Sequence, residues 1–327
     1  MKKFIDSVED FVADSVAGLV EAHSDLLALN PDPLYVRRRQ AKAGKVALVS
    51  GGGSGHEPMH TGYVGQGMLD AACPGLVFTA PTPDQLVAAA TGVEASRGVL
   101  LIVKNYAGDI ASFQTASDML DIDHLMVQVD DDVAVENSTH TIGRRGVAGT
   151  LVVEKMAGAA AEAGADLFEC KALADRVNAS TASMGVAFTS CTVPDADAPT
   201  FDIGPDEMEM GVGIHGEPGR RRMPWMPAEK IVEALLEPLV ADLRLVAGRE
   251  VLLHVNGFGG TPLGELHLLS GVATRRLRSH GIEVKRWLVG NHTTSLEMAG
   301  ASLTLTALDE ELLALWDAPV VTPSLRW

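Results

Sequence analysis

The sequence has few cysteines, few aromatic residues and few basic residues for its length of 327. Its three cysteines, Cys73, Cys170 and Cys191, stand far apart and form no CxxC pair, which favours reduced thiols over disulfides or a zinc site. Lys and Arg number 26 against 43 Asp and Glu, and the net charge of −17 repels phosphate backbones. No apolar run approaches membrane-spanning length, and acidic residues interrupt the N-terminal segment where a signal peptide would be apolar. These absences predict a cytoplasmic protein that binds neither nucleic acid nor membrane.

What the sequence does contain is an alternation of short apolar runs with helical patterns, in a chain that is 46% hydrophobic. Such alternation is typical of α/β folds with parallel, helix-covered sheets. We therefore expect two α/β domains, an N-terminal one over residues 1–182 and a second over residues 183–327, whose C-terminal tail could pack back on the first. Strands are expected at 45–50, 98–103, 125–129, 184–189, 210–215, 251–255 and 302–308. Helices are expected at 8–23, 148–164, 166–179, 228–240, 262–279 and 309–315, with a chain break at 30–33 and a loop at 193–206.

A glycine-rich segment at 51–55 follows the first expected strand directly. Glycines in this place let backbone amides approach a ligand closely. The segment lacks the Lys-Ser/Thr pair of a Walker A loop, and His56 stands where GxGxxG requires its third glycine. We interpret it as a ligand loop of another kind, with a tight ligand-free turn as the alternative.

Two further loops carry polar residues that could join this site. Lys104 and Asp109 follow the strand at 98–103, so a parallel sheet would bring them to the same edge as His56. Taken alone, they could equally be solvated residues, with Asp109 capping the next helix. His215 lies between glycines in the third loop, which leaves its ring approachable as a nucleophile or base, although a lone histidine is often only structural.

Other clusters in the sequence favour structural roles. His56 and His60 lack the helical HExxH spacing and have no thiolate nearby, so we predict no metal site. The carboxylates of 130–132 are consecutive, which fits a turn and cap better than a magnesium cluster. Arg144 and Arg145 could bind an anion at a helix terminus or pair with carboxylates, and the sequence leaves both open.

The three loops together resemble one family, the dihydroxyacetone kinases, and within it their substrate-binding K subunit. The resemblance rests on SGGGSGHEPMHTGYVGQGM at 50–68, LLIVKNYAGD at 100–109 and MGVGIHGEPG at 210–219. It continues through DDDVAV at 130–135, GRRGVAGT at 143–150, NGFGGTPLGEL at 256–266, TSLEMAG at 294–300 and LWDAPVVTP at 315–323. It therefore runs essentially from end to end.

The resemblance implies roles for residues at the matching positions. His215 would form a covalent hemiaminal with the carbonyl of a small hydroxy-ketone, with His56 and Asp109 as acid and base. The substrate-binding set would be Gly53, Ser54, Gly55, His56, Lys104 and Asp109. The ketone site would lie at strand-end loops between the two domains.

The resemblance also implies partners. It implies a homodimer, no cofactor on this chain, and an L subunit that holds ADP or ATP with Mg²⁺. In one branch of the family the bound ADP is rephosphorylated by a phosphotransferase-system protein. In the other branch the nucleotide is exchangeable ATP. Two rival functions remain open: a non-enzymatic ketone-sensing co-activator, and a sugar-phosphate isomerase or lyase that needs no partner.

Four positions depart from the family's pattern: Ala80 replaces a common serine, His140 a tyrosine, His292 another aromatic residue and Ala301 a phenylalanine. Three of these changes reduce or repolarise a side chain. We therefore expect a remodelled pocket or dimer surface, which could admit a four-carbon ketose such as erythrulose.

Overall fold

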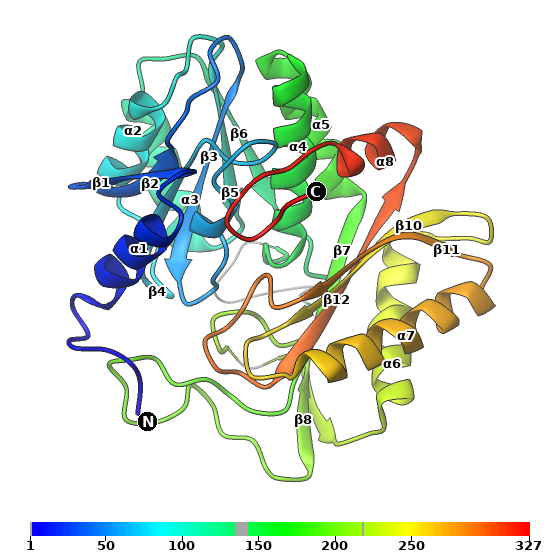
Figure 1. The fold of residues 1–327 in the computed structure, drawn as a ribbon. Helices are drawn as coiled ribbons and strands as arrows, with labels where there is room; N and C mark the ends of the chain where they lie inside the picture. Colours follow the sequence, from blue (N-terminus) through cyan, green and yellow to red (C-terminus); the bar gives the residue numbers. More distant parts are fainter. Residues whose placement is uncertain (1, 135–142, 218) are drawn as a thin grey trace.

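The computed structural model describes residues 2–134, 143–217 and 219–327 and consists of two six-stranded sheets with helices around them (Figure 1). The first half of the chain forms the first sheet, in the order β1-β2-β4-β3-β5-β6. Its strands are β1 (Leu27–Pro31), β2 (Leu34–Arg38), β3 (Ala47–Ser54), β4 (Ala71–Val77), β5 (Val99–Lys104) and β6 (His124–Val129). Its helices are α1 (Phe11–Ala22), η1 (Thr61–Tyr63), α2 (Pro83–Gly92), α3 (Ala107–Met119), α4 (Gly149–Ala163) and α5 (Leu167–Ala179).

The central strands of the first sheet are apolar on both faces because helices cover both. β4, β3, β5 and β6 pair in parallel. On β5, Leu100 and Ile102 pack into the core on the α4 side, whereas Leu101 and Val103 pack against α2 and α3. A continuous apolar run is what a strand buried on both faces requires. The predicted parallel, helix-covered sheet is confirmed for these strands.

The second half of the chain forms a sheet in the order β11-β10-β12-β7-β8-β9, which is mostly antiparallel. Only β10 and β11 pair in parallel. The strands are β7 (Thr181–Ala187), β8 (Glu207–Met210), β9 (Arg221–Pro224), β10 (Glu250–Gly257), β11 (Glu283–Gly290) and β12 (Gly300–Leu308). The helices are α6 (Ala228–Asp242), α7 (Leu263–Ser279) and α8 (Glu310–Asp317).

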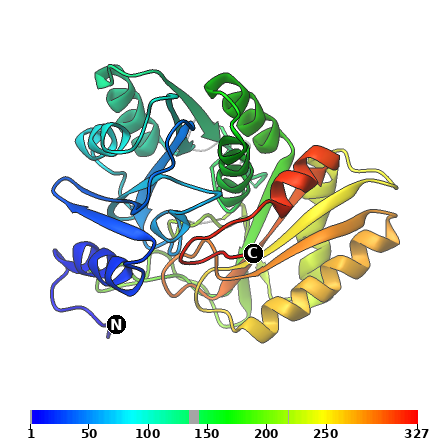
Figure 2. The same cartoon turned by 45° about the horizontal axis from the view of Figure 1, so that its top comes forward.

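Helix α4 joins the two halves. It contacts β3 and β6 of the first sheet, and β7 and β12 of the second. Most of its residues are buried, as expected for a helix with neighbours all round. Helix α8 returns to pack beside α4, and Leu312 and Trp316 join the core of the first sheet (Figure 2). The boundary at 182/183 stays a prediction.

Several element predictions were wrong in detail. The expected chain break at 30–33 is the turn of a hairpin, because β1 and β2 pair on either side of it and Asn30 Nδ2 donates to Pro33 O at 2.7 Å. The run at 210–215 ends its strand at Met210, and the rest is loop. Four elements were not predicted because their apolar residues show no clear periodicity: strands β4, β9 and β11 and helix α2. Asp109 is not the N-cap of α3, since that position belongs to Tyr106 and Asp109 lies in the first turn.

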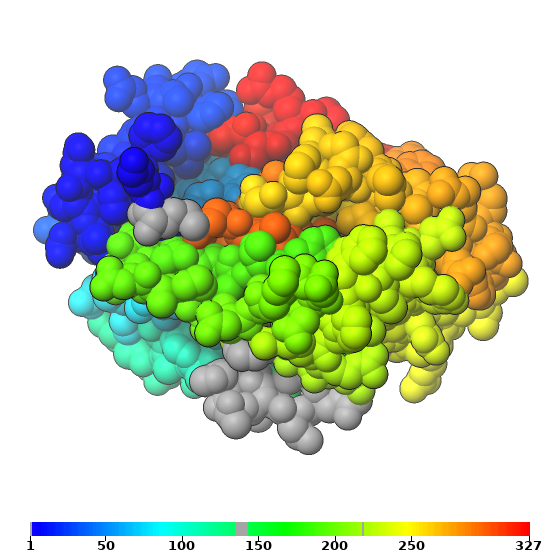
Figure 3. Space-filling view, turned by 90° about the horizontal axis from the view of Figure 1, so that it is seen from below, coloured from blue at the N-terminus to red at the C-terminus, as the bar shows by residue number. Residues whose placement is uncertain are grey.

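The N-terminal segment lies beside the 188–206 loop on one face of the molecule (Figure 3). Glu297 links the two, since its carboxylate accepts from Lys3 Nζ at 2.9 Å and from the Thr192 backbone N–H at 2.8 Å. Among the described residues, no helix combines the length and apolarity that crossing a membrane requires.

Candidate functional site

The glycines at 51–53 extend strand β3 instead of forming a loop, which corrects the sequence prediction. A Cβ at Gly51 would lie 2.6 Å from Cys73 O, and one at Gly53 would lie 2.6 Å from Thr79 N. The turn begins at Gly55, whose φ of +99° favours glycine. These glycines therefore serve close packing of backbone against backbone at the end of β3.

Lys104 and Asp109 meet beside this strand end, as the parallel order predicted. Lys104 closes β5 and is fully buried, and its Nζ lies 3.3 Å from Asp109 Oδ2. Asp109 is in the first turn of α3, where the helix N-terminus stabilises a negative charge. The site thus holds a buried ion pair next to the glycines.

His215 lies in the loop after β8, half-buried and within reach of three other rings. Its ring centroid is 4.2 Å from that of Tyr106, 4.6 Å from that of His56 and 5.4 Å from that of Phe78. Burial, together with the positive charges of Lys104 and Arg145, lowers the pKa of His215 to about 3. The ring is therefore neutral at physiological pH and keeps a nitrogen lone pair for nucleophilic attack.

Arg145 and Glu217 hold the His215 loop in place through hydrogen bonds. Glu217 Oε2 accepts from the His215 backbone N–H at 2.9 Å, and Arg145 donates to Glu217 Oε1 at 3.0 Å and to Gly211 O at 2.8 Å. Arg145 also donates its Nε–H to Asp132 at 2.7 Å. The guanidinium therefore fixes both ends of the loop to the first half of the chain.

His56 is buried with one nitrogen committed and one open. Its Nδ1–H donates to Thr294 O at 2.8 Å, while Nε2 has no hydrogen-bond partner among the described residues. Burial and the neighbouring His215 and Lys104 hold the pKa of His56 well below its usual value. Because Thr294 fixes the tautomer, Nε2 presents a lone pair that can accept a hydrogen bond.

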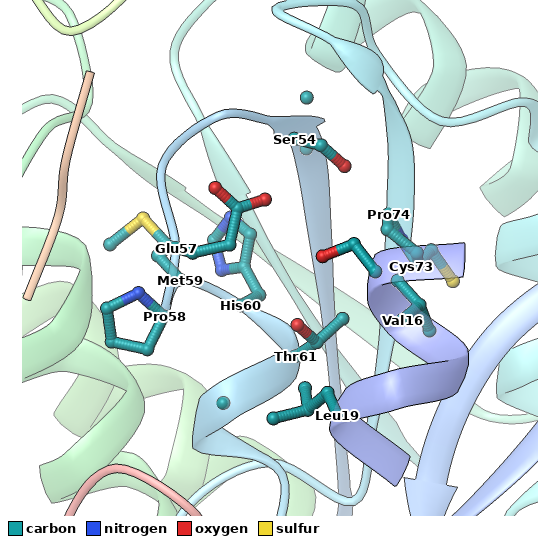
Figure 4. Close-up of a pocket in the computed structure, with 14 residues that line it drawn as sticks. Val16, Leu19, Ser54, Glu57, Pro58, Met59, His60, Thr61, Cys73 and Pro74 are labelled. Atoms are coloured by element: carbon teal, nitrogen blue, oxygen red, sulfur yellow. The ribbon is translucent and has the colours of Figure 1, made fainter. Parts of the chain in front are cut away.

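Four of the predicted site residues line two separate cavities, and Gly55, His56 and Lys104 line neither of the two. The first, here called the histidine cavity, measures about 300 Å³ and is lined by Phe78, Ala80, Tyr106, Gly108, Asp109, His215 and Glu217. The second, the α1 cavity, measures about 320 Å³ and includes Gly53, Ser54 and His60 (Figure 4). Val16 and Leu19 of α1 flank it on one side, opposite the turn at 57–61. His215 and Asp109 thus share one cavity, whereas the glycines border the other.

Two of the predicted substrate-binding residues already form hydrogen bonds within the protein. The Ser54 hydroxyl donates to Gly75 O at 2.7 Å, and the Gly55 N–H donates to both Glu57 carboxylate oxygens, at 3.0 and 3.1 Å. Their roles in holding a substrate remain predictions, as do those of Gly53 and Lys104.

The sequence analysis missed the residues that surround and orient the two histidines: Phe78, Tyr106, Thr294, Arg145 and Glu217. The sequence contains one signal that could have indicated Glu217. Both histidine loops contain Glu-Pro, and in each the glutamate accepts a backbone N–H from two residues earlier. The contacts of Phe78 and Thr294 have no sequence signal, because those residues come from other loops.

The acidic and basic clusters have structural roles. Asp131 accepts from the Val147 and Gly149 backbone N–H groups at 2.8 and 2.7 Å, which caps the start of α4. Arg144 pairs with Asp242, and Arg145 with Asp132 and Glu217. The open alternative for the arginines is therefore resolved in favour of pairing with carboxylates.

Of the three departures that the structure describes, only Ala80 lines the histidine cavity. Ala301 is buried in the core of the second sheet, and the His292 ring lies beside the buried ring of His254, at 5.5 Å between centroids. His140 lies outside the described residues. Among the described departures, the expected pocket remodelling therefore depends on Ala80.

Replacing Arg145 with alanine is expected to lower the free energy of unfolding by about 3–5 kcal/mol, because it leaves the Asp132 carboxylate buried without a cation. Urea denaturation followed by circular dichroism measures the change. Arg144→Ala is the matched control: this arginine is part-exposed, and its loss should cost about 1 kcal/mol or less. Equal losses from both substitutions would contradict the assigned role of Arg145.

Comparison with known proteins gives a consistent family match. The sequence profile of the Dak1 domain matches residues 17–324. The dihydroxyacetone-binding subunit DhaK of the PTS-dependent dihydroxyacetone kinase 1 of Listeria innocua is 49% identical, over 95% of each chain. The corresponding subunit of the PEP-dependent kinase of Escherichia coli is 46% identical, over 100% of this chain and 99% of that one.

Two further matches are relevant to the alternatives. The solved structure of the dihydroxyacetone kinase operon co-activator Dha-DhaQ superposes with a TM-score of 0.91 at 33% identity, over 95% of this chain and 97% of that one. The L-erythrulose 1-kinase of Mycolicibacterium smegmatis is 41% identical over all of this chain, which covers 58% of that protein.

Proposed function

The chain belongs to the Dak1-domain family, and from this premise we propose that it is the ketone-binding subunit of a dihydroxyacetone-type kinase. It holds a small hydroxy-ketone on His215 as a hemiaminal, while a partner subunit supplies the phosphoryl group. The observation that carries the proposal is the neutral, approachable His215 ring in a cavity that it shares with Asp109.

Covalent capture suits so small a substrate. Dihydroxyacetone has only six heavy atoms, and even the ceiling of roughly 1.5 kcal/mol per atom limits its reversible affinity. Glycerol offers nearly the same hydroxyls, so hydrogen bonds alone would discriminate poorly. A ring nitrogen that adds to a carbonyl excludes polyols, because they have no carbonyl to attack.

The adduct forms with a balanced proton transfer. A His215 nitrogen donates its lone pair to the carbonyl carbon, and the π electrons move to the carbonyl oxygen. That oxygen gains a proton while the ring gives up its N–H proton, so adduct and reactants have the same composition. His56 Nε2 and the Asp109 carboxylate are the groups placed to receive and return protons, with Asp109 taking the proton of the hydroxyl that is phosphorylated.

The phosphoryl donor belongs to the partner in this proposal. The chain has no Walker A sequence, and Mg²⁺ with ADP or ATP would bind to a nucleotide-holding subunit that docks over the histidine cavity. The names of the two bacterial relatives, PTS-dependent and PEP-dependent, favour the branch in which ADP stays bound and is rephosphorylated. A homodimer and a cytoplasmic location complete the proposal.

A four-carbon ketose is the second candidate substrate. Ala80 contributes only a methyl group to the wall of the histidine cavity, so this wall lacks the hydroxyl of the serine that is common in the family. Resemblance to an L-erythrulose 1-kinase supports this candidate. The co-activator alternative has less support, because the chain has both His56 and Asp109, the proposed acid and base.

A coupled assay tests the proposed function. The chain is mixed with its cognate nucleotide-binding subunit, with ATP or a phosphotransferase relay, and offered dihydroxyacetone and both erythrulose enantiomers. Phosphorylation of a ketose only when both proteins are present is the expected result. Turnover of triose phosphates by this chain alone would instead indicate an isomerase or lyase.

Ketone capture should be independent of pH from about pH 5 to about pH 8. Capture needs a neutral imidazole, and a His215 pKa of about 3, well below the ordinary value of about 6.5, keeps the ring neutral throughout this range. Titration with ¹³C-carbonyl dihydroxyacetone measures the adduct as a tetrahedral-carbon resonance. A loss of adduct centred near pH 6.5 would show that His215 titrates like an exposed histidine.

A further inference from the structure

A row of buried polar groups extends from Asp109 into the body of the protein, away from the histidine cavity. Lys104 Nζ lies 3.3 Å from Asp109 Oδ2 on one side and 3.0 Å from His60 Nε2 on the other. His60 Nδ1 in turn lies 2.6 Å from Glu154 Oε1, on α4, and 3.1 Å from Ser50 Oγ. All five side chains are buried.

The donors and acceptors in this row allow only one arrangement of the His60 protons. An ammonium group has three N–H donors and no acceptor, so His60 Nε2 must be the acceptor in its contact with Lys104. The ring hydrogen is then on Nδ1, which faces Glu154. Glu154 Oε1, at 2.6 Å, is a nearer acceptor for that hydrogen than Ser50 Oγ, at 3.1 Å.

Glu154 can fill this acceptor role without carrying a charge. Burial raises its pKa to about 8, and its second oxygen, Oε2, has no hydrogen-bond partner among the described residues. The neutral acid can hold its proton on Oε2 while Oε1 accepts from His60. The charges in the row are then only those of Lys104 and Asp109, which compensate each other.

Gly52 gives independent support for this arrangement. A Cβ at this position would lie 2.0 Å from Lys104 Nζ and 3.3 Å from His60 Nε2. Strand β3 therefore leaves out a side chain at the place where the ammonium and the imidazole meet. His60 also borders the α1 cavity, next to Gly52 and Gly53 (Figure 4).

We propose that His60 and Glu154 are positioning residues, which hold the Lys104 ammonium against Asp109 so that the Asp109 carboxylate keeps one orientation toward the bound ketone. Glu154 accepts the Nδ1–H of His60 and so holds the ring, and His60 Nε2 accepts from Lys104 and so holds the ammonium. This rests on the proposed ketone site, to which it adds two residues that do not touch the substrate. Displacing Lys104 would misplace Asp109 while leaving His215 and its loop unchanged.

The tautomer can be measured on the free chain. In the ¹⁵N spectrum of the imidazoles, the His60 signals are assigned by their absence in His60→Gln. Nδ1 should be protonated and Nε2 unprotonated at about pH 7. An Nε2–H tautomer or an imidazolium in the unsubstituted chain would overturn the proposal, because neither can accept from Lys104.

Kinetics of the complete kinase separate positioning from structural support. His60→Ala should lower kcat on the order of 100-fold, as small misplacements of catalytic groups do. His60→Gln, which keeps an acceptor, should recover much of this loss. Glu154→Ala should lower kcat about tenfold, whereas Glu154→Gln, an uncharged acceptor of the same shape, should stay within about threefold of the original chain. Each of these variants should still form the His215 adduct.

Thr150→Val is the matched control, since Thr150 is buried on the same helix and its hydroxyl has no hydrogen-bond partner among the described residues. It should leave kcat unchanged. Full kcat in His60→Ala, or equal losses in Glu154→Ala and Glu154→Gln, would overturn the proposal. Should Glu154→Ala fail to fold, the tautomer and the Gln variants decide the question. Absence of adduct and turnover in the unsubstituted chain would instead count against the proposed function and leave the tautomer measurement intact.

Discussion

Replacing His215 with alanine is expected to abolish the ketone adduct and to lower turnover by the complete kinase by about 1,000-fold or more. The reason is the loss of the covalent bond that both selects the carbonyl and fixes its neighbouring hydroxyl for phosphoryl transfer, since fixed geometry can contribute effective molarities on the order of 10⁵ M. The adduct is measured by ¹³C NMR of labelled dihydroxyacetone, and turnover by the coupled assay.

The fold should survive this substitution. His215 is a half-buried loop residue whose ring packs against three other rings, so its removal should cost about 1 kcal/mol. His267→Ala, at an exposed position on α7, is the control and should change neither adduct nor turnover. A protein-bound tetrahedral-carbon resonance, distinct from that of the free hydrate, that persists in His215→Ala would place the covalent bond elsewhere.

Replacing Asp109 with asparagine is expected to lower kcat by about 10²–10⁴-fold while the adduct still forms on His215. Asparagine keeps the shape of the side chain but cannot take up the proton of the attacking hydroxyl, and general-base catalysis contributes about this factor. Capture should change little, because the His215 ring and the orientation of its loop depend on Tyr106, Arg145 and Glu217.

The two measurements must be read together. Asp118→Asn is the control, since it removes a carboxylate from the exposed side of the same helix and should have no effect. If Asp109→Asn weakened capture and turnover by the same factor, Asp109 would be a binding group and the base would have to be sought at His56 Nε2.

Much of the site could be predicted from the sequence because its residues follow strands that run in parallel. Lys104 closes β5 and the glycines close β3, so neighbouring parallel strands bring them to one edge whatever the details of packing. The resemblance then gave His215, His56 and Asp109 specific roles. The hairpin of β1 and β2 was missed because each strand is only five residues long and carries no clear alternation.

Other features depend on contacts between residues far apart in the chain. Thr294, which fixes the tautomer of His56, is 238 positions away from it in the sequence. Glu154, which contacts His60, is 94 positions away from it. No periodicity or local motif encodes such pairs, because they arise only when α4 and the loop before β12 pack against the turn at 55–60. The acidic cluster shows the same limit, since the sequence predicted a cap but not that Asp132 would pair with Arg145.

The sequence by itself determined the fold class, the family and the histidine on which the proposed chemistry depends, because strand-end glycines and a glycine-flanked histidine are local patterns. Only the tertiary structure decided the protonation of that histidine and the division of the site residues between two cavities. The physical reason is that a pKa depends on desolvation and on charges such as Lys104 and Arg145, which folding brings near His215 from other parts of the chain.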